Sequence, residues 1–185
     1  MKKILLSIAA LICMCLVCIA ETKTYKISSY CTMDIPSTLV LRDTPGVGGA
    51  QYCFWPGLNS KYYSRILVTI GDANGLSESD IKSASKADLD ALSNSQKSQL
   101  ISAMKRTGQD ASRLKWYPIT LESVNGHFAM VQKCIRPGLN GDVYSINYMM
   151  VYKGARIEFT LSYRVSESNL WKADFEKVMK TIVWK

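Results

Sequence analysis

The chain has 185 residues, of which 48% are hydrophobic and 21% are charged, and its formal net charge is +8 at pH 7. The basic residues are scattered along the sequence, whereas a nucleic-acid-binding protein would cluster them, so we expect no nucleic-acid partner. The moderate positive charge is typical of a solvated surface with some affinity for anionic envelopes.

The first twenty residues have the pattern of a secretory signal peptide. Lys2 and Lys3 precede an apolar run over residues 4–17, and small residues follow at the position where signal peptidase cleaves. The run is shorter than the ~20 residues of a comfortable membrane span, so a retained anchor is the weaker alternative. We therefore predict cleavage after Ala20 and export to the periplasm or the outside of the cell, with no membrane span left after cleavage.

Cysteines inside the apolar run raise the alternative of a lipoprotein. Lipidation requires a small residue directly before the modified cysteine, but Met14 precedes Cys15 and Val17 precedes Cys18. We interpret these cysteines as small hydrophobic residues. Residues 21–185 are then expected to form one exported domain of ordinary size.

Residues 21–108 predict strands followed by helices. Alternating and apolar runs predict strands at 25–33, 39–41, 51–55 and 65–70, with a flexible glycine-rich loop at 43–49. Two capping boxes, Ser77-x-x-Asp80 and Ser85-x-x-Asp88, predict helix starts. A short helix is expected after the second box, and then a longer one that ends at Gly108.

The remaining residues predict two hairpins and a closing helix. Strands at 117–124 and 127–135 flank Asn125-Gly126, and strands at 143–152 and 155–164 flank Lys153-Gly154. A final helix, capped by Ser166 or Ser168, has one apolar stripe formed by Trp171, Phe175, Val178 and Ile182. The order of strands, helices, strands and helix predicts an α+β domain with an antiparallel β-sheet flanked by helices.

This arrangement resembles the PsbP-like fold, which photosystem extrinsic proteins share with bacterial envelope proteins of the DcrB type. The resemblance spans most of residues 21–185 and rests on the following features: the Ile35-Pro36-Ser37 end of the first strand, the middle helices, the Asn125-Gly126 hairpin and the closing Trp171-x-x-x-Phe175-x-x-Val178-Met179-x-x-Ile182 helix. It implies an α/β/α sandwich that serves as a binding or assembly module. It identifies no ligand, and no functional residue is carried over from it.

One pattern occurs twice in the chain: Gln51-x-Cys53-x-x-Pro56-Gly57-Leu58-Asn59 recurs as Gln132-x-Cys134-x-x-Pro137-Gly138-Leu139-Asn140. Pro followed by Gly favours a type II turn, so each copy predicts a strand, a turn and a strand. If the two hairpins lie side by side, Cys53 and Cys134 could form a disulfide worth about 4 kcal/mol in loop entropy. Cys31 would then be the spare thiol, and unpaired buried cysteines are the alternative.

The same arrangement would place Trp55 and Arg136 on one rim, each directly before its Pro-Gly turn, with Tyr62 and Tyr63 nearby. Exposed aromatic side chains beside an arginine stack on sugars or anchor a protein partner. These four residues are therefore the candidate ligand-binding residues, for a glycan or for an envelope or extracellular protein. The alternative is that Phe54 or Trp55 packs beneath the loop.

The sequence holds no recognisable catalytic motif. His127 follows a turn and is expected to be an exposed loop residue, and it should lie on the opposite face of its strand from Cys134. Serine-nucleophile, zinc-protease and phosphate-loop motifs do not occur, and the spacing of the cysteines and the histidine fits no metal site, so we expect no cofactor and no metal. We predict a non-catalytic binding or assembly module of the cell envelope. The alternative is a small secreted hydrolase that uses carboxylates not evident from the sequence.

Overall fold

The computed structural model describes residues 21–42 and 49–185. The predicted signal peptide at 1–20 lies outside the described residues, as does all but Gly49 of the loop expected at 43–49. Among the described residues no helix is both long enough and apolar enough to cross a membrane.

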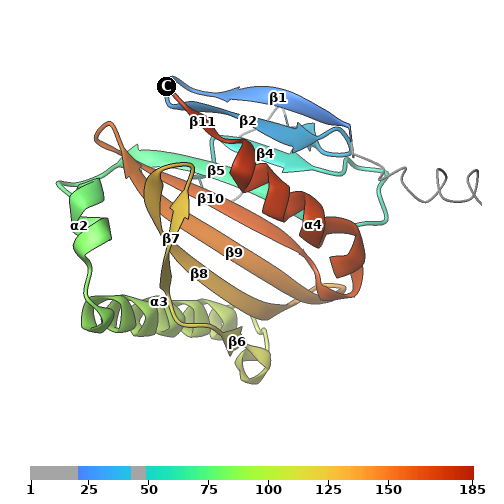
Figure 1. The fold of residues 1–185 in the computed structure, drawn as a ribbon. Coiled ribbons are helices and arrows are strands. Elements are labelled where there is room, and N and C mark those ends of the chain that lie inside the picture. Colours follow the sequence, from blue (N-terminus) through green and yellow to red (C-terminus); the bar gives the residue numbers. More distant parts are fainter. Residues whose placement is uncertain (1–20, 43–48) are drawn as a thin grey trace, which may run out of the picture.

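An eight-stranded antiparallel sheet forms the centre of the molecule (Figure 1). Its strands follow the order β3-β4-β5-β10-β9-β8-β6, and β7 also pairs with β8. The strands, in chain order, are β3 Val40–Leu41, β4 Tyr52–Trp55, β5 Ser64–Asp72, β6 Lys115–Trp116, β7 Thr120–Val124, β8 His127–Gly138, β9 Gly141–Tyr152 and β10 Ala155–Arg164. Of the long central strands, β8, β9 and β10 follow one another in the chain, whereas β5 comes from a distant part of it.

A small sheet and one helix cover one face of the large sheet. The small sheet has the order β1-β2-β11, with β1 at Thr22–Ile27, β2 at Cys31–Pro36 and β11 at Val183–Trp184. Beside it lies α4, Ser168–Val178, which Figure 1 shows crossing in front of the large sheet. The buried residues of β2, α4 and the facing side of the large sheet form one continuous hydrophobic core.

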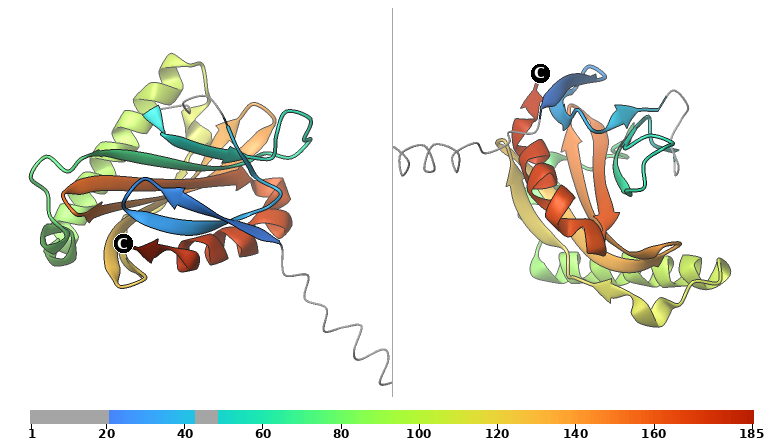
Figure 2. Two further views of the ribbon diagram at one scale, coloured as in Figure 1. Left: turned by 90° about the horizontal axis from the view of Figure 1, so that it is seen from above. Right: turned by 90° about the vertical axis from the view of Figure 1, so that its right-hand side faces the viewer.

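Two helices lie on the other face of the large sheet (Figure 2). They are α2, Glu78–Ser83, and α3, Lys86–Arg106, and each begins with the capping box predicted from the sequence. The short and the long helix expected after Ser85 are one continuous helix. It ends just before Gly108, whose φ of 68° suits the residue beyond a helix C-cap. Short 3-10 turns occur at η2 Ala111–Arg113, η3 Val165–Glu167 and η4 Met179–Thr181.

The alternation predicted for β10 is confirmed. Ile157, Phe159, Leu161 and Tyr163 are all buried on the core face, where α4 contributes Trp171 and Phe175. Ile182 extends the buried stripe of this helix beyond its last residue. Neither expected serine caps α4, because Glu167 occupies the N-cap position and makes no side-chain capping bond.

Both predicted tight hairpins are present. Asn125 and Gly126 have φ values of 50° and 91°, and Lys153 and Gly154 have φ values of 49° and 74°. Two consecutive positive φ values are the geometry of the two-residue turn whose twist matches the flanking strands. These turns fix the register of β7 with β8 and of β9 with β10.

The single strand predicted at 25–33 is wrong. The chain reverses after β1, where Ser28 has a φ of 52°, and Ile27 pairs with Cys31 across the turn. Because this reversal keeps the odd-numbered residues on the buried side of both strands, the alternation continues in phase through the turn. A single strand and a tight hairpin therefore leave the same pattern in the sequence.

The two copies of the repeated pattern form different turns. In the first copy Gly57 has a φ of 89°, as a Pro-Gly turn requires. In the second copy Pro137 and Gly138 belong to β8, and the turn is formed by Leu139 and Asn140. Gly138 is required there because a Cβ would lie 2.8 Å from a methyl group of Val143.

The predicted disulfide between Cys53 and Cys134 is wrong, because all three cysteines of the described chain are free and buried. Cys53 lies on β4 and Cys134 on β8, with β5, β10 and β9 between them. Four strand spacings of about 4.8 Å place the two residues roughly 19 Å apart, beyond the reach of a disulfide. The alternative of unpaired buried cysteines describes this structure.

Burial raises the pKa of the Cys31 thiol to about 11, although the Lys185 ammonium opposes the shift. The unfolded chain ionises this thiol near its ordinary value of 9.0, so the unfolded state binds fewer protons between pH 9 and pH 11. The folding stability contributed by Cys31 is thus present below pH 9 and is lost as the pH rises towards 11. We expect wild type to lose about 2 to 3 kcal/mol more than Cys31→Val over this range, measured by urea denaturation at each pH. Equal losses in both proteins would contradict the buried thiol.

Candidate functional site

The four candidate ligand-binding residues all lie at one end of the large sheet, where β4, β8 and β10 finish and β5 and β9 begin. Tyr63 and Arg136 line the same cleft, which has a volume of about 300 Å³. Trp55 and Tyr62 are not among the residues that line it. The repeated pattern predicts a single rim. The structure instead has a cleft lined by Tyr63 and Arg136, with Trp55 and Tyr62 outside it at the same end of the sheet.

Three arginines line this cleft, one from each of three strands. Arg65 comes from the start of β5, Arg136 from the end of β8 and Arg164 from the end of β10. Leu139 and Asn140, in the turn from β8 to β9, also line the cleft. We call this feature the arginine cleft.

The register of the sheet explains why the arginines converge. Arg136 pairs with Val143 and Val143 pairs with Arg164, so the three side chains form a row on one face. Arg65 pairs with Ser162, which precedes Arg164 by two residues on β10. Since residues two apart on a strand share a face, Arg65 lies on the same face as the row, one pair further along the strands.

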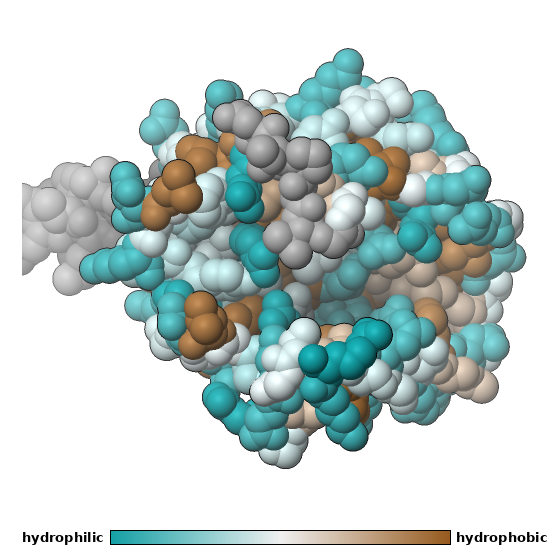
Figure 3. Space-filling view, turned by 180° about the vertical axis from the view of Figure 1, so that it is seen from behind, coloured by the Kyte–Doolittle hydropathy of each residue, from teal (hydrophilic) through white to brown (hydrophobic). Residues whose placement is uncertain are grey.

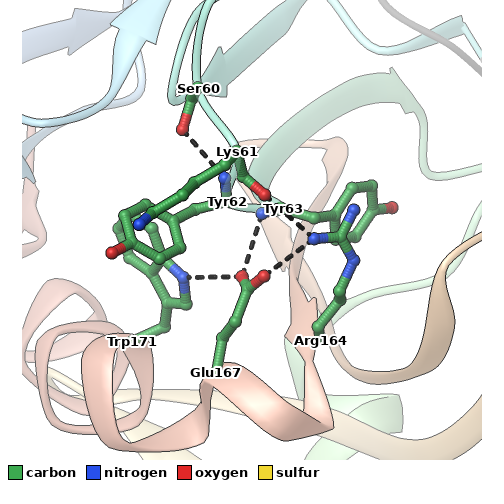
Figure 4. A network of polar contacts seen from close by, with 7 residues as sticks. All are labelled: Ser60, Lys61, Tyr62, Tyr63, Arg164, Glu167 and Trp171. Carbon is green, nitrogen blue, oxygen red and sulfur yellow. Dashed lines mark hydrogen bonds and ion pairs between the residues drawn. The ribbon is translucent and has the colours of Figure 1, made fainter.

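Arg164 is held by a network of polar contacts around Glu167 (Figure 4). Arg164 Nη1 lies 2.8 Å from Glu167 Oε1, and the Tyr63 backbone N–H donates to Glu167 Oε2 at 2.9 Å. The indole N–H of Trp171 donates to the same oxygen at 3.3 Å. Arg164 also donates to the Lys61 carbonyl oxygen at 3.1 Å, so this network ties the 60–63 segment to the start of α4.

Arg65 and Arg136 have no carboxylate partner within the described part of the chain. The Arg65 guanidinium lies 4.9 Å from the centroid of the Tyr63 ring and donates to the Tyr63 hydroxyl, while its buried Nε makes no hydrogen bond. Arg136 makes no side-chain hydrogen bond to the described residues either. The cleft is therefore a site of uncompensated positive charge.

The two candidate residues outside the cleft each lie beside a basic residue. The Arg42 guanidinium lies 4.7 Å from the centroid of the Trp55 ring. Tyr62 is 42% exposed, packs edge-on against Trp171 and has the Lys61 ammonium 5.2 Å above its ring. Of the two residues that could have packed beneath the loop, Phe54 is the buried one, and Trp55 stays partly exposed.

The expectation that His127 is an exposed loop residue is wrong. His127 begins β8, and its ring packs against Tyr152 and Trp184 at centroid distances of 4.9 and 5.3 Å. Its Nδ1 lies 3.0 Å from a carboxylate oxygen of Glu78, and this contact holds the pKa of Glu78 below its usual value. As predicted, Cys134 lies on the opposite face of the strand. The pairing of β8 with β9 continues through Cys134 and Ser145 without a break, and His127 and Cys134 are an odd number of residues apart.

A second cavity, of about 350 Å³, lies between β7, β8, β9 and α4 and contains two carboxyl groups, from Glu122 and Glu176. This cavity is one place where the alternative, a carboxylate hydrolase, would find a pair of carboxyl groups. Glu122 is bound by the Lys133 ammonium at 2.8 Å. Burial and the nearby Glu122 carboxylate raise the pKa of Tyr148, which also lines the cavity, to about 12. Groups of three or more potential metal ligands do not occur among the described residues.

Comparisons with known proteins identify the fold. No family model matches the sequence, and no curated protein sequence is detectably similar to it. The solved structure of cyanobacterial PsbP (CyanoP) from Synechocystis sp. PCC 6803 matches with a TM-score of 0.61 at 15% identity, over 92% of this chain and 96% of that chain. The chain has the PsbP-like fold.

A second structure supports this PsbP-like fold. LpqN of Mycobacterium tuberculosis, described as involved in cell envelope biogenesis, matches with a TM-score of 0.51 at 9% identity, over 89% of this chain and 91% of that chain. The predicted resemblance and the predicted α+β class are both confirmed. At such low identities the likeness shows the PsbP-like fold and carries no ligand or activity with it.

Sequence reasoning missed Arg65 and Arg164 as members of the site. The alternation of β10 does place Arg164 on the polar face of that strand, which is a usable signal. The pattern carries no information on which strands lie beside β10. Only the strand order brings Arg65, Arg136 and Arg164 to one cleft.

Proposed function

We propose that this protein is an exported, non-catalytic binding module of the cell envelope, and that the arginine cleft binds an anionic group of its ligand. The observation that carries the proposal is the convergence of Arg65, Arg136 and Arg164, for which Glu167 is the only counter-charge among the described residues. Guanidinium groups present paired donors that match carboxylate and phosphate oxygens, so a phosphate or carboxylate group is the fitting ligand chemistry.

Two lines support the envelope compartment. Residues 1–20 have the pattern of a secretory signal peptide. LpqN, which shares the fold, is described as involved in cell envelope biogenesis. A binding module is also what the sequence predicts, because no recognisable catalytic motif occurs in it.

We expect the protein to bind inorganic phosphate with a dissociation constant on the order of 1 mM, typical of a few charge-assisted hydrogen bonds. Arg136→Gln should weaken this binding by about tenfold, because it removes a guanidinium with no other partner among the described residues. The phosphate affinity of Arg136→Lys should lie between those of wild type and Arg136→Gln, because an ammonium keeps the charge and loses the paired donors. Isothermal titration calorimetry at low ionic strength measures all three.

The matched control is Arg156→Gln. Arg156 lies on the same face of β10 as Arg164 but at the other end of the strand, and it is paired with Glu158 at 3.0 Å. This variant should bind phosphate as wild type does. If Arg136→Gln and Arg156→Gln weaken phosphate binding equally, the weakening follows from the lower net charge, and the cleft is not the binding site.

A further inference from the structure

Leu58 and Leu139 are the most exposed large hydrophobic residues of the described chain, at 88% and 99%. They occupy equivalent positions in the two copies of the repeated pattern, each directly after its Pro-Gly pair. Leu58 lies in the connection from β4 to β5 and Leu139 in the turn from β8 to β9, so both lie at the same end of the sheet. In Figure 3, hydrophobic side chains stand out among hydrophilic ones at the left-hand end, which is this end.

The arginine cleft lies between these two leucines. Leu58 follows β4 and Leu139 follows β8. Strands β5, β10 and β9 separate these two strands, so β4 and β8 are roughly 19 Å apart at about 4.8 Å per strand spacing. Arg65 and Arg164 belong to two of the strands in between, and Leu139 itself lines the cleft. This end of the sheet thus presents two separate apolar tips with a positively charged hollow between them.

Other residues at this end have the same character. Trp55 and Tyr62 are partly exposed, and each lies beside a basic side chain. Of the carboxylates that the structure describes near the cleft, Glu167 is paired with Arg164 and Asp142 with Arg113, so these two leave little negative charge to repel an anionic surface. Aromatic and basic residues around protruding apolar side chains are the composition of a surface that lies in the headgroup layer of a membrane.

We propose that this end of the domain docks on an anionic phospholipid bilayer, with Leu58 and Leu139 in the interfacial layer and a lipid phosphate in the arginine cleft. The proposal rests on the proposed function, because it uses the same cleft and names the anion. Charge complementarity favours an anionic over a neutral surface. Two isolated leucine tips favour a fluid surface over a protein partner, because protein hot spots are contiguous packed patches in which leucine is under-represented.

The test is co-flotation of the exported form of the protein with vesicles of phosphatidylcholine, with and without about one third phosphatidylglycerol. We expect binding to the anionic vesicles that falls with added salt, and at least about tenfold weaker binding to neutral vesicles. The double variant Leu58→Asn/Leu139→Asn should bind the anionic vesicles at least about tenfold more weakly, since two leucines no longer leave water. Arg136→Gln should weaken vesicle binding about fivefold.

Val183→Asn is the matched apolar control. Val183 is 62% exposed on β11, and the neighbouring Lys185 carbonyl accepts a bond from Tyr152 at the opposite end of the sheet. This variant should float as wild type does, and thermal melting of every variant checks that it is folded.

Phosphate titration of the same variants separates this inference from the proposed function. Docking on a bilayer is supported if the leucine double variant loses vesicle binding, and if Leu58→Asn alone, at a residue that does not line the cleft, weakens vesicle binding and keeps wild-type phosphate affinity. The docking inference alone is overturned if phosphate binding depends on Arg136 while the protein ignores anionic vesicles or binds them equally well without the two leucines. The docking inference would also be overturned if the leucine double variant still bound the vesicles but no longer bound a protein partner that wild type binds. The proposed function itself fails if Arg136→Gln leaves phosphate affinity unchanged.

Discussion

Glu167→Ala is expected to lower the free energy of unfolding by about 3 to 5 kcal/mol, because it leaves a largely buried charge without its partner. The side chains of Glu167 and Arg164 are only 12% and 19% exposed. The substitution also leaves the Tyr63 backbone N–H and the Trp171 indole N–H without their acceptor. Urea denaturation followed by tryptophan fluorescence measures the loss.

Two comparisons make this expectation specific. Glu167→Gln keeps an oxygen acceptor and the size of the side chain, so it should cost less than half as much as Glu167→Ala. Asp90→Ala removes the partner of Lys86 in an exposed pair, whose side chains are 46% and 87% exposed, and it should cost less than about 1 kcal/mol. If Glu167→Ala costs no more than Asp90→Ala, the network around Glu167 does not hold the 60–63 segment to α4.

Phe159→Ala is expected to cost about 3 to 5 kcal/mol of unfolding free energy, because it opens a cavity that the surrounding core cannot close. Phe159 is fully buried on the central strand β10, and its ring centroid lies 6.4 Å from that of Trp184 on the small sheet. The substitution therefore removes packing between the two sheets. The urea concentration at the midpoint of unfolding should fall, while the slope of the unfolding free energy against urea concentration stays unchanged.

Thr160→Ala is the control for Phe159→Ala. Thr160 is the next residue of the same strand and faces the other side of the sheet, where it is only partly buried. It should cost less than about 1 kcal/mol. Similar losses for the two variants would mean that the main core does not lie on the Phe159 face.

Local features of this fold could be read from the sequence because their causes are local. Asn125-Gly126 and Lys153-Gly154 form tight turns since each has a glycine, which accepts positive φ, at its second position, and the first turn has an asparagine before it. The capping boxes at Ser77 and Ser85 satisfy the first backbone N–H groups of their own helices.

The errors share a different origin. The hairpin of β1 and β2 was hidden because its turn preserves the phase of the alternation. The disulfide between Cys53 and Cys134 required two hairpins to be neighbours, and the order β4-β5-β10-β9-β8 separates them. In both cases the sequence pattern is compatible with two pairings, and only long-range contacts select one.

The candidate site divides in the same way. The repeated pattern drew attention to Arg136, Tyr63 and the leucine-bearing turns, all of which lie at one end of the sheet. It did not indicate Arg65 or Arg164. No spacing along the chain shows that β5 lies beside β10 in the sheet, or that only β9 separates β10 from β8.

The α+β class, the helix starts, the tight turns and the buried face of β10 can be predicted from local sequence, since each follows from the preferences of a few consecutive residues. The order of strands, the free cysteines, the packing of the half-buried His127 and the meeting of three arginines follow from the tertiary structure alone. These features depend on which distant segments pair, and that choice is made by burial of the whole core rather than by any one stretch of the chain.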